Sequence, residues 1–189
     1  MTKCENTRNF KHHHRGKTSE QYLEKDAILD ALDIRPGQII LDAGCGNGYM
    51  AKAFAEQLDG TGKVYALDPD EISISVLQSE TEGTVIEPFI GNITEQTKLK
   101  NASIDLIYLS TVFHGFNETQ IAGFNKEIRR LLKPKGRLAI LEIVKEETPV
   151  GPPLDMRLSP EELKQTIPLN PMNLVMIGPF FYMQIFENE

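Results

Sequence analysis

Residues 39–48, Ile-Ile-Leu-Asp-Ala-Gly-Cys-Gly-Asn-Gly, set a short apolar strand directly before a turn with glycine at every second position. Met50, Phe54 and Leu58 follow at helical spacing. Glycine has no Cβ, so the backbone of such a turn can approach a ligand closely, and the start of the next helix offers N–H groups to an anionic group. The stretch therefore predicts a strand–turn–helix unit with the outline of a nucleotide-binding crevice.

Strand and helix patterns alternate on both sides of this unit. We expect buried strands at 39–43, 64–67, 85–90, 104–109 and 138–141. Helical patterns fall at 19–32, after residue 48, from Asp70 to about residue 78, at 121–132, and for about two turns from Ser159. Strands and helices that alternate at these lengths predict a doubly wound parallel sheet with helices on both faces.

The end of the chain departs from this alternation. Residues 172–178 and 180–186 read as two strands joined by Gly178-Pro179, a connection too short for a parallel crossover. The expected fold is therefore α/β, with a doubly wound, mostly parallel seven-stranded sheet and an antiparallel C-terminal strand pair.

Composition predicts one domain. A chain of 189 residues with 40% hydrophobic content can bury one sizeable core, which we assign to residues 19–189. Cys4 and Cys45 lie far apart, so no disulfide framework is expected, and a reducing cytoplasm fits best. The longest apolar stretch is too short to cross a bilayer, so no membrane partner is expected.

Charge divides the chain into two parts. Residues 1–18 carry a net charge of +4. Since the whole chain carries −7, the remaining residues carry −11. This basic arm would contact nucleic acid or a phosphorylated substrate, fold back on the acidic body, or stay a mobile terminus. We favour the last because termini are seldom ordered unless tied down. The acidic body argues against nucleic acid as a partner. Consecutive side chains point in different directions, so His12, His13 and His14 are not expected to form a metal site.

Several polar residues follow the expected strand ends, where ligands bind in doubly wound sheets. Asp68 lies 20 residues after Gly48, the separation at which an acidic residue accepts hydrogen bonds from ribose hydroxyls. A dinucleotide fingerprint would need a small third residue, but Tyr49 stands at that position. The glycine spacing therefore suits S-adenosylmethionine better than a dinucleotide.

Five motifs in order give the chain a family resemblance. They are Leu41–Gly48, Asp68-Pro69, Gly91–Ile93, Ser103–Ile107 and Leu132–Leu138. On these motifs the chain resembles the class I S-adenosylmethionine-dependent methyltransferases, in particular the small-molecule members of the ubiquinone and menaquinone biosynthesis type. The resemblance covers residues 38–142 and implies a Rossmann-like fold, S-adenosylmethionine as cofactor and a small-molecule acceptor.

The resemblance also implies a cofactor site. By this resemblance, the glycine turn contacts the methionine part and the ribose of S-adenosylmethionine, and the end of the second strand binds the ribose hydroxyls. Residues 92 and 93 contact adenine, and the residues after the fourth strand border the methyl group. The residues are Asp42, Gly44, Cys45, Gly46, Asn47, Gly48, Asp68, Pro69, Asn92, Ile93, Ser110 and Thr111. Asn92 stands where the family usually has aspartate, which keeps an acceptor but loses a charge. Other interpretations of these residues stay open. Gly46 and Gly48 would simply form a tight turn, Asp68 would cap the helix near Asp70, and Cys45 would be a small buried filler.

The acceptor side is less clearly marked. Methyl transfer from a sulfonium depends mainly on alignment, so a base is optional. His114 is the candidate base, with a loop histidine bonded to backbone as the alternative. Arg157 and Tyr182 are candidates for substrate contact, against a structural role for each.

Three functions compete on these observations. The first is an enzyme that methylates a small molecule, and the second is a noncatalytic module that binds the cofactor or its product. The third, NAD-dependent oxidoreduction, conflicts with Tyr49. Nucleic-acid methylation is disfavoured because no Asn/Asp-Pro-Pro-Tyr/Phe motif follows residues 104–109. The oligomeric state is not predicted.

Overall fold

The computed structural model describes residues 23–189, so the arm predicted at 1–18 lies outside the described residues. The strands are β1 (Ile39–Ala43), β2 (Lys63–Asp68), β3 (Ile86–Ile90), β4 (Ile104–Ser110), β5 (Leu132–Ile143), β6 (Asn170–Ile177) and β7 (Phe181–Glu187). The helices are α1 (Lys25–Leu32), α2 (Tyr49–Gln57), α3 (Glu71–Glu80), α4 (Glu118–Leu131) and α5 (Pro160–Thr166), with short 3₁₀-helices η2 (Phe113–Gly115) and η3 (Leu154–Met156).

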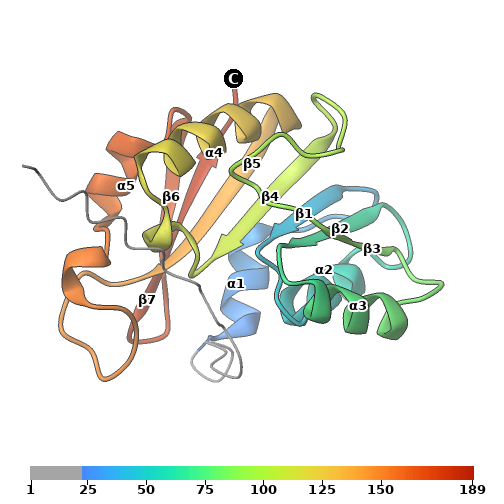
Figure 1. Ribbon diagram of the computed structural model, residues 1–189, viewed down its shortest axis with the longest axis horizontal. Helices are drawn as coiled ribbons and strands as arrows, with labels where there is room; N and C mark the ends of the chain where they lie inside the picture. Colours follow the sequence, from blue (N-terminus) through green and yellow to red (C-terminus); the bar gives the residue numbers. More distant parts are fainter. Residues whose placement is uncertain (1–22) are drawn as a thin grey trace, which may run out of the picture.

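The strands form one seven-stranded sheet in the order β3-β2-β1-β4-β5-β7-β6 (Figure 1). Strands β1 to β5 pair in parallel, whereas β7 runs antiparallel to both β5 and β6. The predicted fold class, including the antiparallel C-terminal pair, is confirmed.

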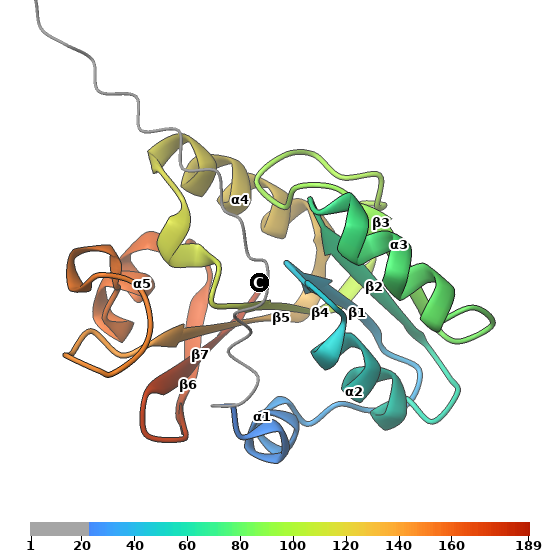
Figure 2. The ribbon, with the colours of Figure 1, turned by 60° about the horizontal axis from the view of Figure 1, so that its bottom comes forward.

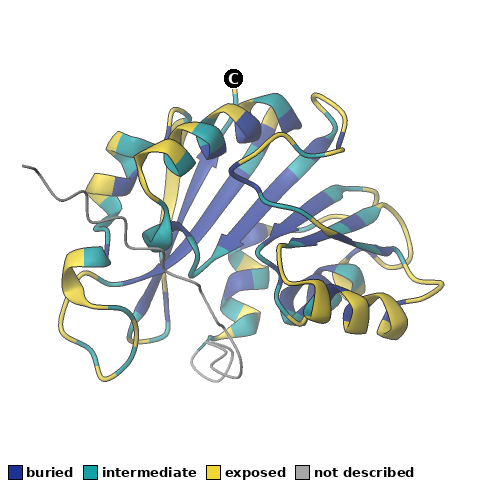
Figure 3. Cartoon of the chain, viewed as in Figure 1, coloured by how far each residue is buried: buried dark blue, intermediate teal, exposed yellow. Residues whose placement is uncertain are grey.

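Helices cover both faces of the sheet. In Figure 1, α1, α2 and α3 lie on one face, and α4 and α5 lie on the other. Ile28, Phe54 and Leu77 pack into the core of the first face, and Phe124 and Leu163 into that of the second. The central strands are therefore buried from both sides (Figure 3), which explains their unbroken apolar runs.

Capping residues set where the last two helices begin. Asn117 and Gln120 form a reciprocal capping box, so α4 begins at Glu118, three residues before the expected start. Ser159 and Glu162 form the same arrangement at α5, with Pro160 as its first residue. The α5 helix ends at Thr166, which confirms the two turns that the sequence predicts.

The start of the fifth strand also differs from the expectation. The fifth strand begins at Leu132 instead of residue 138, because Leu132 pairs with Ile104 before the ladder resumes at Leu106 opposite Arg137. Residues 133–136 lie outside the regular register, and Lys135 adopts φ +64°. The Lys-Pro-Lys-Gly stretch thus forms an irregularity within β5 as well as ending the helix before it.

The parallel strands bring their carboxyl ends to one edge of the sheet (Figure 2). The turn after β1, the end of β2, the loop after β3 and the segment after β4 meet there. No helix within residues 23–189 is long and apolar enough to cross a membrane. The same residues hold no cluster of three or more histidine, cysteine or acidic side chains suited to a metal ion, and His12, His13 and His14 lie outside them.

Candidate active site

The glycine turn between β1 and α2 is fastened to the neighbouring strand. The backbone N–H groups of Gly44 and Cys45 both donate to the carbonyl of Leu67 in β2, at 2.7 and 3.1 Å. Gly44, Gly46 and Gly48 all adopt positive φ, at +76°, +51° and +78°. Residues with a Cβ adopt this backbone at a cost, so the alternate glycines allow the chain to turn sharply here.

The three glycines have different surroundings. A Cβ on Gly44 would lie 2.8 Å from Val112, and one on Gly48 would overlap Leu77, so packing alone excludes a side chain at both positions. A Cβ on Gly46 would meet no atom within 4 Å. The middle of the turn therefore borders open space, as a backbone cradle for a ligand requires.

Asp68 links this turn to the end of β2. Its Oδ2 accepts a hydrogen bond from the N–H of Gly46 at 2.9 Å, and its Oδ1 accepts one from the N–H of Asp70 at 2.8 Å. Asp70, not Asp68, caps α3, because the Asp70 side chain accepts from Ile72. Each carboxylate oxygen can accept more than one hydrogen bond, so Asp68 holds the turn and keeps capacity for hydroxyl donors. Pro69 follows it directly.

Buried oxygens without partners lie behind the turn. Asp42 in β1 stands opposite Tyr108 in β4, and Ser110 follows on the same face of β4. Within the described residues, Asp42 Oδ2, the Tyr108 hydroxyl and Ser110 Oγ are buried and make no hydrogen bond. Buried polar atoms are ordinarily satisfied by ordered water or a ligand when protein offers no partner. These three buried oxygens therefore fit a site that binds water or the polar atoms of a ligand.

The carboxyl of Asp42 is electrostatically perturbed. Burial, together with the negative charge of Asp68, raises its pKa to about 7, and a hydrogen bond from the N–H of Ala51 opposes the rise. Asp42 therefore changes charge near neutral pH, directly beside the glycine turn.

The loop after β3 carries the residues expected at adenine. Asn92 Oδ1 accepts hydrogen bonds from both the N–H and the hydroxyl of Thr94, at 3.0 and 2.9 Å. A carbonyl oxygen has two lone pairs, so the acceptor expected to meet the adenine amino group is already engaged by the loop. The Asn92 NH₂ group is what this side chain has left to offer a ligand. Ile93 is buried, and its N–H has no partner among the described residues.

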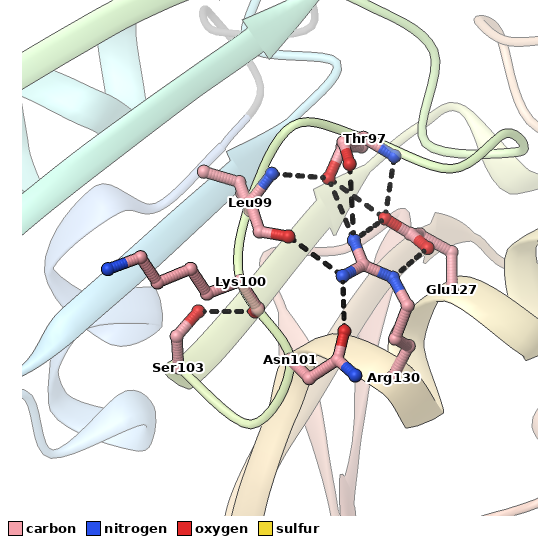
Figure 4. Close-up of polar contacts among 7 residues, drawn as sticks. All are labelled: Thr97, Leu99, Lys100, Asn101, Ser103, Glu127 and Arg130. Carbon is pink, nitrogen blue, oxygen red and sulfur yellow. Dashed lines mark hydrogen bonds and ion pairs between the residues drawn. The ribbon is translucent and has the colours of Figure 1, made fainter.

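A network on α4 holds this loop in place (Figure 4). Glu127 Oε1 accepts from the N–H and hydroxyl of Thr97, both at 2.8 Å, and pairs with Arg130 at 2.6 Å. Arg130 also donates to the Leu99 carbonyl and to Asn101, each at 2.7 Å. Burial favours the neutral acid at Glu127, but the hydrogen bonds from Arg130 and Thr97 outweigh it and lower the pKa of Glu127 below its usual range.

The segment after β4 closes the site on the other side. Thr111 adopts φ +54°, and its N–H donates to the Leu141 carbonyl at 2.8 Å. A β-branched residue in this conformation costs about 1–3 kcal/mol and persists only where its surroundings impose it. Since Val112 packs against Gly44, the strained residue lies between β4 and the glycine turn.

His114 has a partner that the sequence did not reveal. Its Nδ1 lies 2.8 Å from Glu142 Oε2, and its backbone N–H donates to Glu142 Oε1 at 3.2 Å. Glu142 comes from β5, 28 residues further along the chain. Burial lowers the pKa of His114, but the hydrogen bond and charge of Glu142 outweigh it and raise the pKa above its usual value.

Both residues expected to contact substrate are buried and bonded to protein. Arg157 donates to the carbonyls of Pro152, Glu146 and Val150 and to the Thr148 hydroxyl, so its guanidinium holds the loop after β5. Tyr182 has no exposed surface, and its hydroxyl donates to the Leu158 carbonyl at 2.8 Å. The geometry thus favours the structural alternative for both residues, because their polar groups are engaged by neighbouring backbone.

Cys45 and Asn47 complete the turn. Cys45 is 8% exposed, and burial raises the pKa of its thiol, as expected for a small buried filler. The Asn47 side chain accepts from the N–H of Tyr49 at 3.1 Å and so supports the first turn of α2. Neither residue brings a reactive group to the site.

The strand order, the glycine turn after β1 and the acidic residue at the end of β2 are those expected of the Rossmann-like methyltransferase fold that the sequence resemblance implies. Residues 40–136, just over half of the chain, match the family described as "Methyltransferase domain", and the chain belongs to this family.

Comparison with individual proteins agrees. The chain is 32% identical over 134 residues to the ubiquinone/menaquinone biosynthesis C-methyltransferase UbiE of Hydrogenovibrio crunogenus, covering 68% of this chain and 51% of that protein. It is 31% identical over 132 residues to UbiE of Bordetella avium, covering 69% and 51%. The chain thus spans about half the length of these curated relatives.

Solved structures share the fold. A SAM-dependent methyltransferase from Aquifex aeolicus superimposes with a TM-score of 0.81 at 22% identity, covering 90% of this chain and 93% of that one. A TehB-like SAM-dependent methyltransferase from Corynebacterium glutamicum gives a TM-score of 0.68 at 20% identity, covering 87% and 88%.

Proposed function

We propose that the protein is an S-adenosylmethionine-dependent methyltransferase that transfers a methyl group to a small-molecule acceptor by in-line displacement. The observation that carries the proposal is the open space at Gly46, with Asp68 fixed to the same turn. Membership of the methyltransferase domain family supports the choice of cofactor over a dinucleotide.

Each part of the site has a role in holding the cofactor. The backbone of Gly44–Gly48 would face the amino-acid portion, and Asp68 would accept from the ribose hydroxyls. Ile93 would offer its N–H to adenine, and Asn92 its NH₂ group to a ring nitrogen. When bound, S-adenosylmethionine supplies a methyl group on a sulfonium, a good leaving group. The residues then have to align the acceptor and exclude water, which provides much of the catalysis.

A small acceptor is supported by the names of similar proteins. The two UbiE proteins described above are named for ubiquinone and menaquinone biosynthesis. The loop after β5, held by Arg157, and the segment from Ser110 to His114 are the elements that could border an acceptor. The proposal includes the cytoplasmic location and the division into an arm at 1–18 and a domain at 19–189, both inferred from the sequence.

Calorimetric titration of the full chain with S-adenosylmethionine and S-adenosylhomocysteine tests the cofactor assignment. Saturable 1:1 binding is expected, weakened in Asp68→Ala and unchanged in Asp59→Asn, a control at an exposed position of the turn after α2. Absence of binding by both compounds contradicts the proposal. Transfer of labelled methyl groups to an acceptor panel then tests activity, and tight binding with no transfer would favour the noncatalytic alternative.

A further inference from the structure

His114 and Glu142 form a pair at the carboxyl edge of the sheet. His114 lies in η2, directly after β4, and Glu142 is the second-last residue of β5, the adjacent strand. Figure 2 shows the segment between β4 and α4, which contains η2, at the carboxyl ends of the strands. Both carboxylate oxygens of Glu142 face His114, one at the ring Nδ1 and one at the backbone N–H. These contacts fix the ring as well as the backbone that carries it.

The pairing determines which ring nitrogen is free. A carboxylate accepts hydrogen bonds, so the proton of the neutral imidazole lies on Nδ1 and Nε2 keeps its lone pair. Within residues 23–189, Nε2 makes no hydrogen bond. The Glu142 side chain is 2% exposed, whereas that of His114 is 12% exposed, so the pair reaches the surface through the imidazole.

Other charged and titratable groups around the pair do not compete for Glu142. Arg157 directs its N–H groups to carbonyls of its own loop and acts on His114 only through its charge, which lowers the pKa of the imidazole. Tyr182 stands opposite Glu142 in β7, but its hydroxyl donates to Leu158. Glu142 therefore has His114 as the hydrogen-bond partner of its side chain among the described residues.

The pair also lies close to the proposed transfer site along the chain. Val112, two residues before His114, packs against Gly44 of the glycine turn. Ser110 and Thr111, at the end of β4, are the residues expected beside the methyl group. The imidazole is thus held on the segment that connects the cofactor loop to the acceptor side.

We propose that His114 is the general base of the methyl transfer, that Glu142 is its positioning residue, and that the acceptor is a molecule that loses a proton when it is methylated. This inference rests on the proposed function. The acceptor atom forms a bond to the methyl carbon as the carbon–sulfur bond breaks, and the electron pair of that bond stays on sulfur. The proton of the acceptor passes to His114 Nε2 and then to water. Hydroxyl, thiol and acidic carbon acceptors meet this condition, whereas tertiary amines and thioethers have no such proton.

The first test measures the imidazole directly. The pKa of His114 is followed by NMR in the full chain, with its signal assigned from its loss in His114→Asn. The expected pKa lies above the ordinary 6.5 and falls by about one unit or more in Glu142→Gln, which removes the charge. It should stay unchanged in Glu147→Gln, an exposed acid in the next loop. A pKa that does not move in Glu142→Gln overturns the assignment of Glu142.

The second test measures rates with labelled donor and defined probes: hydroquinone, benzenethiol and acetylacetone as protic acceptors, and pyridine and dimethyl sulfide as aprotic ones. Transfer is expected to the protic set, with a rate that rises with pH through the pKa of His114 and a limb that shifts to lower pH in Glu142→Gln. His114→Asn keeps an N–H toward Glu142 but has no base, so kcat should fall about 100-fold or more with little change in the donor KM. Transfer confined to the aprotic set, or a pH profile that does not move, overturns the proposal.

Donor binding separates this inference from the proposed function. His114→Asn and Glu142→Gln should bind S-adenosylmethionine as the unmodified chain does. If the unmodified chain binds no donor, the proposed function fails. If it binds the donor and His114→Asn retains full activity toward a protic probe, only the base assignment fails.

Discussion

Replacement of Gly46 by alanine separates a ligand cradle from an ordinary tight turn. The added methyl group meets no protein atom within 4 Å, so the cost to the fold comes from the backbone, which has φ +51°. A left-handed residue with a Cβ costs about 1–2 kcal/mol. For a domain of this size, each 1 kcal/mol lowers the melting temperature by about 2–4 °C. Gly46→Ala should therefore lower the melting temperature by only a few degrees.

The same methyl group enters the space assigned to the cofactor. The affinity for S-adenosylmethionine should fall at least about tenfold, which corresponds to about 1.4 kcal/mol of binding free energy. Gly48→Ala is the matched comparison, because its methyl group overlaps Leu77 and disturbs the packing of α3. It should lose more stability than Gly46→Ala at a similar backbone cost.

Differential scanning calorimetry and isothermal titration on the same preparations measure both quantities. The expected pattern is a small loss of stability with a large loss of affinity at residue 46, and a large loss of stability at residue 48. Unchanged affinity in Gly46→Ala would refute the reasoning, because the open space would then not be the place where the ligand binds.

Further predictions concern charge, the loop after β3 and the arm. The pKa of Asp42 rises on folding from 3.8 to about 7, so this group stabilises the fold least above pH 7. Relative to the unmodified chain, Asp42→Asn should therefore gain unfolding free energy as pH rises from 4 to 7, by at most about 4 kcal/mol. A difference in unfolding free energy that stays constant in urea titrations across that range would count against this prediction. Arg130→Ala leaves the buried Glu127 with only Thr97 as a hydrogen-bond partner. The free energy of unfolding in urea should fall by about 2 kcal/mol, a loss limited by the partial exposure of Arg130. Amide hydrogen exchange should become faster at residues 92–101, and unaltered exchange there would mean that the network does not hold the loop. Because the pKa of Glu127 is lowered on folding, this loss should shrink as pH falls below 4.5. Deletion of residues 1–18 should leave the melting temperature unchanged, and unfolding of that variant would show that the arm is structural.

The strands and their directions could be predicted because their signals are local. The apolar runs of β1, β2 and β4 and the short link at Gly178-Pro179 identify strands and the antiparallel pair without knowledge of distant contacts. The start of β5 could not be predicted, since it depends on Leu132 pairing with Ile104 across a sheet that the local sequence does not describe.

The sequence could not predict which side chains of the site form hydrogen bonds with protein groups distant along the chain. The turn glycines follow from a contiguous motif, but the Glu142 partner of His114 comes from another strand 28 residues away. One signal was available: Glu142 is an acid within the apolar run of residues 138–143, and a buried acid needs a partner. Arg157 and Tyr182 have chemistry suited to substrates, and only the fold shows that neighbouring backbone groups occupy them.

Amide chemical shifts of the ¹⁵N-labelled full chain, titrated with S-adenosylmethionine, test the central claim at residue level. Saturable changes should be largest at Gly44–Gly48, at Asp68 and Asp70, and at Ile93, whose N–H lacks a partner among the described residues. Changes concentrated elsewhere, or no saturable change at all, would contradict the assignment of this edge of the sheet as the cofactor site.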